Sequence, residues 1–184
     1  VDDLGGVREE FAELDAALAI LLKSKRAADA EEILLPARHR RDALALADED
    51  TPNAIISMAT LTGAARVAVG PDLAPYYAQS DASAAALETA AKQVQDPVWR
   101  MPFWDPYEEM IEPGIADLDN APNGGFAGSI TAALFLRRFA TETPNYIHFD
   151  IYGWQPSSAP ARPKGGVGQA SRALLAALPK LLDL

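Results

Sequence analysis

The run Ala54–Ala59 is the feature that most restricts how this chain can fold. Its residues read Ala-Ile-Ile-Ser-Met-Ala, without alternation of polar and apolar side chains. A strand with one face in water alternates, whereas a strand covered on both faces is apolar along its length. A strand of this kind needs helices on both sides. The sequence therefore predicts an α/β fold of three layers, α/β/α, with a mostly parallel or mixed central sheet.

The rest of the chain alternates between helical and extended patterns. Apolar residues at helical spacing predict helices at residues 7–30, 42–48, 80–95, 129–140 and 169–182. Two further strands are expected at residues 64–69 and 146–152, with loops rich in Pro and Gly at residues 97–123 and 154–166. In the last strand, Ile147 and Phe149 would face one side of the sheet, and His148 and Asp150 the other.

The composition excludes several classes of function. The chain has 184 residues, a formal net charge of −10 and no cysteine. Binding to nucleic acid or to an anionic membrane surface draws on clustered Lys and Arg, so this charge balance argues against both. Without cysteine, neither a disulfide nor a thiol nucleophile can form. No segment reads as a membrane-spanning helix or as a secretory signal, and a cytoplasmic location is therefore expected.

The turn after the buried run is the segment most suited to binding. Thr60-Leu61-Thr62-Gly63 leaves the strand through small residues, which expose backbone N–H and C=O groups. Such groups can hold a peptide or an anion. The alternative is a tight crossover in which Gly63 serves only the backbone geometry.

This turn belongs to a series of blocks that resembles the leucyl aminopeptidase family. Ala59–Ala64, which reads Ala-Thr-Leu-Thr-Gly-Ala, is similar to the sequence that follows the catalytic loop in that family. Other blocks resemble the family in the same order: Asp42–Asp48, Trp99–Trp104, Ile115–Asn120, Gly128–Leu136 and His148–Ile151. Several ordered blocks are more specific than any one of them. Residues 42–184 thus resemble the C-terminal portion of the family's catalytic domain, and residues 1–41 form an N-terminal helical segment that does not match.

The resemblance implies a metallo-aminopeptidase lineage. In this family two divalent ions, Mn²⁺ or Zn²⁺, activate a water molecule that releases N-terminal amino acids from peptides. Some of the metal-binding carboxylates lie directly before the helix that matches Asp42–Asp48. Here residues 35–41 read Leu-Pro-Ala-Arg-His-Arg-Arg and offer no carboxylate. No catalytic residue and no metal ligand can therefore be assigned, and Ser57 stands where the family usually has Asp.

The resemblance does assign part of the substrate pocket. Thr60, Leu61 and Gly63 match positions that line the substrate site in the family. Ala132 matches a small residue in the pocket for the first side chain of the peptide.

Other groups of residues each have two interpretations. Asp48–Asp50 could bind a cation weakly or form a solvated helix end. His148 and Asp150 could pair as a base and its orienting group, or His148 could be buried and bonded to another neighbour. Gly124–Ser129 could hold an anion at a helix start or allow close backbone packing. The tryptophans are expected to be anchors of the core or of an interface: Trp99, Trp104 and Trp154.

Two functional hypotheses follow. The first is an aminopeptidase whose activity needs another polypeptide to supply the metal-binding half, with a peptide as substrate. The second is a shortened, non-catalytic relic that persists as a folded domain or as an interaction subunit, in which residues 1–41 cover a face of the sheet. Members of the family assemble as hexamers through this half of the protein. The resemblance therefore implies a homo-oligomer, or an assembly with a relative, as the natural partner.

Overall fold

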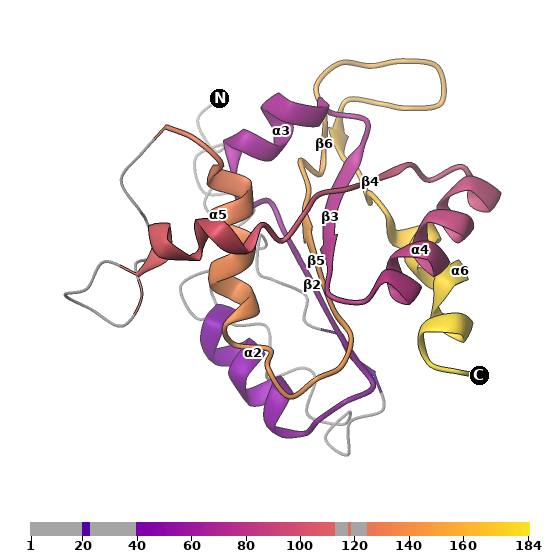
Figure 1. Ribbon diagram of the computed structural model, residues 1–184. Helices are drawn as coiled ribbons and strands as arrows, with labels where there is room; N and C mark the ends of the chain where they lie inside the picture. Colours follow the sequence, from indigo (N-terminus) through magenta and orange to yellow (C-terminus); the bar gives the residue numbers. More distant parts are fainter. Residues whose placement is uncertain (1–19, 23–39, 113–117, 119–124) are drawn as a thin grey trace, which may run out of the picture.

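The computed structural model describes residues 20–22, 40–112, 118 and 125–184. A central sheet separates two layers of helices, as Figure 1 shows. The strands are β1 (Ile20–Leu22), β2 (Ala54–Ala59), β3 (Ala74–Ala78), β4 (Val98–Arg100), β5 (Tyr146–Asp150), β6 (Trp154–Gln155) and β7 (Gly165–Gly166). The helices are α2 (Arg40–Glu49), α3 (Gly63–Val69), α4 (Asp81–Val94), the 3₁₀ helix η3 (Asp105–Ile111), α5 (Gly128–Arg137) and α6 (Ser171–Leu181).

The main sheet is mixed, as the sequence predicts. Its strand order is β1-β2-β5-β3-β4. Strands β2 and β5 run parallel, as do β3 and β4, whereas β1–β2 and β5–β3 are antiparallel. All of β5 is buried, and in β2 only Met58 is partly exposed. The apolar run that predicted a strand covered on both faces is therefore explained by its place beside β5 within the sheet.

Two apolar clusters fill the spaces between the layers. Ile147 and Phe149 pack on the side of the sheet that α4 and α6 cover, together with Ile56. Tyr146 and Ile55 pack on the opposite side, against α2 and α5. Because neighbouring strand residues point to opposite faces, this division confirms the alternation predicted for residues 146–150.

The strand predicted at residues 64–69 is wrong, because these residues form α3. The hydroxyl of Thr62 accepts a hydrogen bond from Ala65 N at 3.2 Å and caps the helix. Val67, which suggested a strand, lies on the exposed side of the helix with 82% of its surface accessible. The sheet instead gains β3, which the sequence did not indicate because Pro75 argues against an interior strand.

The helix predicted at residues 7–30 is wrong where the structure describes it. Residues 20–22 form β1, which pairs antiparallel with β2 through Ile20–Ile56 and Leu22–Ala54. The strand satisfies backbone groups that β2 would otherwise leave open at the edge of the sheet. The rest of the predicted helix lies outside the described residues, and the division into residues 1–41 and 42–184 stays a prediction.

Helix α6 is capped by a side chain from a distant part of the chain. Asp96, which is buried, accepts hydrogen bonds from Ala170 N, Arg172 N and Ala173 N at 3.2, 2.9 and 3.1 Å. The first residues of α6 provide no capping side chain of their own. A carboxylate at this end also complements the helix dipole, so Asp96 fixes α6 against the end of α4.

Asp48 is a buried anchor, which corrects the prediction that residues 48–50 form a solvated helix end. Its side chain is 5% exposed and accepts from Thr141 N, Glu142 N and Thr143 N at 2.7, 2.8 and 2.8 Å. Burial alone would raise the pKa of this carboxyl, but the backbone donors outweigh it and hold the pKa below its ordinary value. Asp48 thereby ties the end of α2 to the segment that leads into β5.

We expect Asp48→Asn to lower the free energy of unfolding at neutral pH by about 1–3 kcal/mol, because an amide cannot accept from all three N–H groups. The folded-state pKa lies below the ordinary value of 3.8. The advantage of the wild type is therefore complete above that value and disappears as the pH falls through the folded-state pKa. Urea unfolding over a pH series, with exposed Glu49→Gln as control, measures this. A difference that does not shrink in acid would contradict it.

Candidate functional site

The turn at residues 60–63 lies where two parallel strands end side by side. Ala59 of β2 is in register with Asp150 of β5, and Ile151 N donates to Ala59 O at 2.9 Å. In α/β proteins, ligands bind in the crevice outside the carboxyl ends of parallel strands. The position of the turn is therefore one that this class of fold uses for binding.

A single buried carboxylate, that of Asp150, holds the turn. Its Oδ1 accepts from Leu61 N at 3.1 Å and from Thr62 N at 2.9 Å. Its Oδ2 accepts from Thr62 Oγ1 at 2.6 Å and from Ser129 Oγ at 2.8 Å. Asp150 is fully buried, and both of its oxygens are engaged by donors. Asp150 therefore acts as a structural acceptor here, not as a free base.

A tyrosine extends this network into the sheet. Tyr77 Oη lies 2.7 Å from Ser129 Oγ, and because the serine proton points to Asp150, Tyr77 is the donor. Burial raises the pKa of Tyr77, which keeps the phenol protonated and able to donate at neutral pH. Strand β3, helix α5 and strand β5 thus each contribute a side chain that holds the turn.

The hydroxyl of Thr60 has no partner in the part of the chain that the structure describes. Its Oγ1 is buried and makes no hydrogen bond there. The methyl group of Thr60 packs against Gly153, where an added Cβ would lie 3.3 Å from Thr60 Cγ2 and where φ is +64°. Both the close approach and the left-handed backbone favour glycine at this position. The Thr60 side chain is thereby fixed against Gly153, with its hydroxyl unpartnered among the described residues.

Gly63 begins α3 and is exposed, with open space around the position that a Cβ would occupy. Neither crowding nor a left-handed backbone requires glycine there, so the alternative of a purely conformational glycine has no support in the packing. Of the four predicted residues, Thr60, Leu61 and Gly63 share the turn. Ala132 is half-buried on α5, one helical turn after Ser129, which binds Asp150. The role of all four in binding stays a prediction.

His148 is bonded to a neighbouring strand. Its Nδ1 lies 2.9 Å from Ser57 Oγ, which also lies 2.9 Å from Tyr146 Oη, and the ring stacks on Tyr77 with centroids 6.1 Å apart. Asp150 bonds to the turn instead, so the two residues do not form the predicted base and orienting group. The structure shows the alternative, a fully buried histidine bonded to another side chain. Ser57, where the family usually has Asp, supplies that bond.

The glycine-rich entry to α5 provides close packing. A Cβ at Gly128 would lie 3.6 Å from the Cβ of Ala64, so α5 begins in contact with α3. The next residue, Ser129, turns inward to Asp150 and does not point to a ligand. Gly124 lies outside the described residues. The contacts of Gly128 and Ser129 therefore favour close packing over an anion site.

The described residues do not fit the two-metal site that the resemblance implies. Within residues 20–22, 40–112, 118 and 125–184, no three Asp, Glu, His or Cys side chains gather in a group that could hold a metal ion. Asp150, the carboxylate at the turn, is fully engaged by protein donors. We therefore derive no chemical step through a metal from these residues.

The geometry defines a class: an α/β domain whose candidate binding turn follows a parallel strand and is fixed by a buried carboxylate. The family profile described as "Cytosol aminopeptidase family, catalytic domain" matches residues 37–175. The chain therefore belongs to the cytosol aminopeptidase family, which confirms the resemblance seen in the sequence.

Relatives and solved structures agree with this assignment. A "probable cytosol aminopeptidase" from Roseiflexus castenholzii is 44% identical over 140 residues, which are 74% of this chain and 28% of the relative. One from Chlorobium luteolum is 42% identical over 76% of this chain. The crystal structure of cytosol aminopeptidase from Coxiella burnetii matches 82% of this chain, and 32% of its own, with a TM-score of 0.73 and 40% identity. A mutant of tomato leucine aminopeptidase matches with a TM-score of 0.63 and 31% identity.

The network around Asp150 was missed by sequence reasoning. Asp150, Thr62, Ser129 and Tyr77 hold the turn, but they come from segments up to 88 residues apart. The only signal was an acidic residue at the end of a buried strand, which must find donors if it is to remain charged.

We expect Asp150→Asn to reduce the free energy of unfolding by roughly 2–4 kcal/mol, because an amide cannot accept from all the donors of the network. The exchange of the Leu61 and Thr62 amide hydrogens should also accelerate. Asp72→Asn is the matched control, since it removes only an exposed ion pair with Arg162. Chemical denaturation and hydrogen exchange measure both effects. Equal stability of the two variants would refute the role assigned to Asp150.

Proposed function

We propose that this chain is an aminopeptidase-like domain that forms the wall of a site for the N-terminal residue of a peptide. We also propose that residues 1–184 do not hydrolyse peptides by themselves. The observation that carries the first part is the turn at residues 60–63, fixed from behind by Asp150 while the Thr60 hydroxyl has no protein partner in the described residues. The second part rests on the chemistry of residues 35–41.

The turn suits a ligand that carries N–H groups better than an anion. Asp150 already accepts from the N–H groups of Leu61 and Thr62, and it places a negative charge behind the turn. Within the described residues, the carbonyl oxygens of Thr60 and Leu61 accept no hydrogen bond. The groups that remain for a ligand are therefore acceptors and a hydroxyl. The ammonium and amide N–H groups of a peptide N-terminus complement them.

The proposal of inactivity follows from what hydrolysis would require. A metal-bound water is the nucleophile in this family, and carboxylates must hold the metal ions. At the place where the resemblance expects such carboxylates, residues 35–41 read Leu-Pro-Ala-Arg-His-Arg-Arg. The chain also spans 28% of the length of the curated relatives named above. Turnover would then need side chains beyond those of residues 1–184.

The relatives are named cytosol aminopeptidases, and among the described helices none is long and apolar enough to cross a membrane. We propose the cytoplasm as the compartment on the strength of those relatives.

Calorimetry with leucine amide tests the binding site. We expect a dissociation constant on the order of 1 mM for so small a ligand, with no requirement for metal. Ala132→Phe should weaken binding by about tenfold or more, because the larger side chain fills the space next to the turn. Ala85→Phe places the same side chain at an exposed position of α4 and should leave binding unchanged. Absence of saturable binding would reject the proposed wall.

A hydrolysis assay tests inactivity separately. Leucine amide is incubated with the chain in the presence and absence of Mn²⁺ and Zn²⁺, with the Coxiella burnetii enzyme as the positive control for the assay. We expect no turnover, since residues 35–41 offer no carboxylate at the place where the resemblance expects metal ligands. Stoichiometric binding of Mn²⁺ together with turnover would show that other side chains of the chain form the metal site, and the proposal of inactivity would fail.

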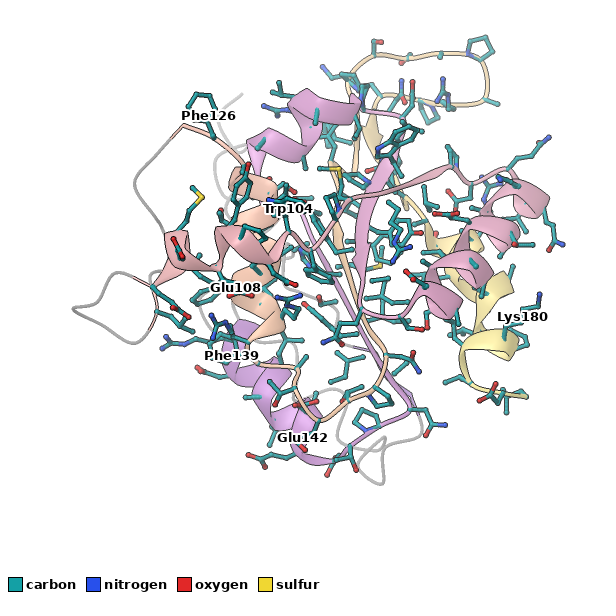
Figure 2. The ribbon with its side chains drawn as sticks, viewed as in Figure 1. Trp104, Glu108, Phe126, Phe139, Glu142 and Lys180 are labelled. Atoms are coloured by element: carbon teal, nitrogen blue, oxygen red, sulfur yellow. The ribbon has the colours of Figure 1, made fainter. Side chains whose placement is uncertain are left out.

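The exposed aromatic side chains favour a second role, that of a subunit. Trp99, Trp104 and Trp154 are 55%, 51% and 43% exposed, so they are not anchors of the core, and Phe126 is 87% exposed. Figure 2 shows Phe126 projecting from the chain just before α5. Aromatic side chains are enriched in interfaces. We propose that the chain forms a homo-oligomer or assembles with a longer relative. Sedimentation of the chain alone distinguishes a homo-oligomer from a monomer. Sedimentation of the chain together with the relative detects the mixed assembly.

A further inference from the structure

A cavity lies at the opposite end of β5 from the turn. It has a volume of about 470 Å³ and is lined by Ala78, Gln79, Arg100, Met101, Pro102, Phe103 and Arg137. Ala78 is the last residue of β3, and Gln79 comes directly after it. Arg100 is the last residue of β4, and residues 101–103 come directly after it. Because these two strands are parallel, the cavity occupies the crevice outside their carboxyl ends. Gln79 N donates to Tyr146 O at the start of β5, whereas the turn lies beyond Asp150 at its end, about 13 Å away.

Two arginines line this cavity on a chain whose net charge is −10. Their side chains are 36% exposed for Arg100 and 23% exposed for Arg137, and the Arg137 guanidinium lies over the Phe103 ring at 5.0 Å. No acidic residue is among the described residues that line the cavity. Arginine presents a planar fork of donors that matches the oxygens of carboxylates and phosphates.

Among the residues that the structure describes, most donors of these two guanidiniums have no acceptor. Arg100 uses only Nη2, in an ion pair with Asp81 Oδ1 at 2.6 Å. Arg137 also uses only Nη2, with Asp105 Oδ1 at 2.7 Å and Glu108 Oε1 at 2.5 Å. In the described part of the chain, Nε and Nη1 of both arginines donate to no acceptor. These atoms are therefore available to a ligand.

Gln79 contributes a further donor. Its Oε1 accepts from Tyr146 N at 3.2 Å, which fixes the orientation of the amide group. The Nε2 group is left without a protein acceptor in the described residues. Three side chains from three different segments thus bring unused N–H donors to one cavity.

We propose that this cavity binds a small dianion, either a dicarboxylate or a phosphate, between Arg100 and Arg137. The volume of the cavity lies within the range of small-molecule sites. Two negative charges would let one ligand contact both guanidiniums, in addition to the carboxylates that already pair with them. The carboxylate and phosphate alternatives share this chemistry and are separated by the choice of probe.

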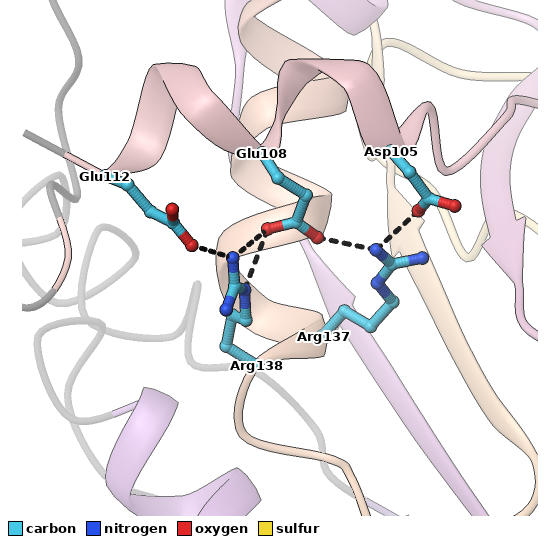
Figure 3. Close-up of polar contacts among 5 residues, drawn as sticks. All are labelled: Asp105, Glu108, Glu112, Arg137 and Arg138. Atoms are coloured by element: carbon cyan, nitrogen blue, oxygen red, sulfur yellow. Dashed lines mark hydrogen bonds and ion pairs between the residues drawn. The ribbon is translucent and has the colours of Figure 1, made fainter.

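The existing ion pairs compete with the ligand and do not exclude it. The side chain of Asp81 is 92% exposed and that of Asp105 is 75% exposed, and pairs of this kind contribute little to stability. Figure 3 shows how Arg137 also joins Glu108, which in turn binds Arg138, and how Arg138 reaches Glu112. A bound anion would share or replace the exposed carboxylates while Glu108 keeps Arg137 in place.

Titration calorimetry with succinate and with inorganic phosphate, at constant chloride concentration, tests the proposal on the full chain. We expect saturable binding of at least one probe with a dissociation constant on the order of 1 mM. Arg100→Gln and Arg137→Gln should each weaken it by about tenfold or more. Asp105→Asn should tighten it by about twofold to threefold, because the anion no longer competes with that carboxylate.

Arg138→Gln is the matched control for Arg137→Gln. Both variants break the ion pairs between η3 and α5, but Arg138 does not line the cavity. Arg138→Gln and the remote Arg162→Gln should change affinity by less than about twofold. Arg100→Gln loses only a bond to an exposed aspartate, so it folds even if Arg137→Gln does not.

Preference for succinate identifies a dicarboxylate as the ligand class, and preference for phosphate identifies a phosphate ester; both support the site. Absence of saturable binding for both probes would overturn the proposal. It would also fail if Arg100→Gln and Arg137→Gln bind as tightly as the wild type, or if Arg138→Gln loses as much affinity as Arg137→Gln.

Discussion

The buried carboxylate of Asp150 is the interaction on which the rest of the candidate site depends. An ionised carboxylate inside a protein must be compensated by donors, and here the donors come from the turn itself and from α5. The hydroxyl of Thr62 serves twice, because it donates to Asp150 and accepts from Ala65 N at the start of α3. One charge thereby sets the end of the turn, the beginning of a helix and the position of α5.

The same use of carboxylates recurs elsewhere in this acidic chain. Asp48 binds the segment at residues 141–143, and Asp96 caps α6, each through three backbone N–H groups. In all three places the acidic side chain joins segments that are far apart in sequence. In the described residues, these three acidic side chains thus hold the protein together. This is consistent with a domain that keeps the architecture of its family while the metal-binding chemistry lies elsewhere.

Much of the fold could be predicted because local pattern and burial agree. The apolar run Ala54–Ala59, the alternation in β5 and the helices α2, α4, α5 and α6 follow the expected periodicities. The failures have definite causes. Val67 and Val69 suggested a strand, but the Thr62 cap starts a helix. Pro75 hid an interior strand, and the apolar residues 20–22 satisfied the open edge of β2 instead of continuing a helix.

The candidate site could be predicted only in part, for the same kind of reason. The turn was visible because small residues after a buried strand are a local pattern. The network behind it was not, since the partners of Asp150 at residues 61, 62 and 129 are brought together by the order of the strands. The alternative pairing of His148 with Asp150 was attractive because both lie on one face of β5. It failed because the histidine bonds to Ser57 on the neighbouring strand, at 2.9 Å, while Asp150 accepts from the turn and from Ser129.

We propose that the turn is already formed to recognise the N-terminal residue of a peptide, before any metal is present. The most direct test is an NMR titration of the isotope-labelled chain with leucine amide in the presence of a metal chelator. We expect saturable shifts of the amide signals of residues 60–63 and of Ala132 on α5. Saturable shifts that are confined to other parts of the molecule, or no saturable shifts at all, would contradict it.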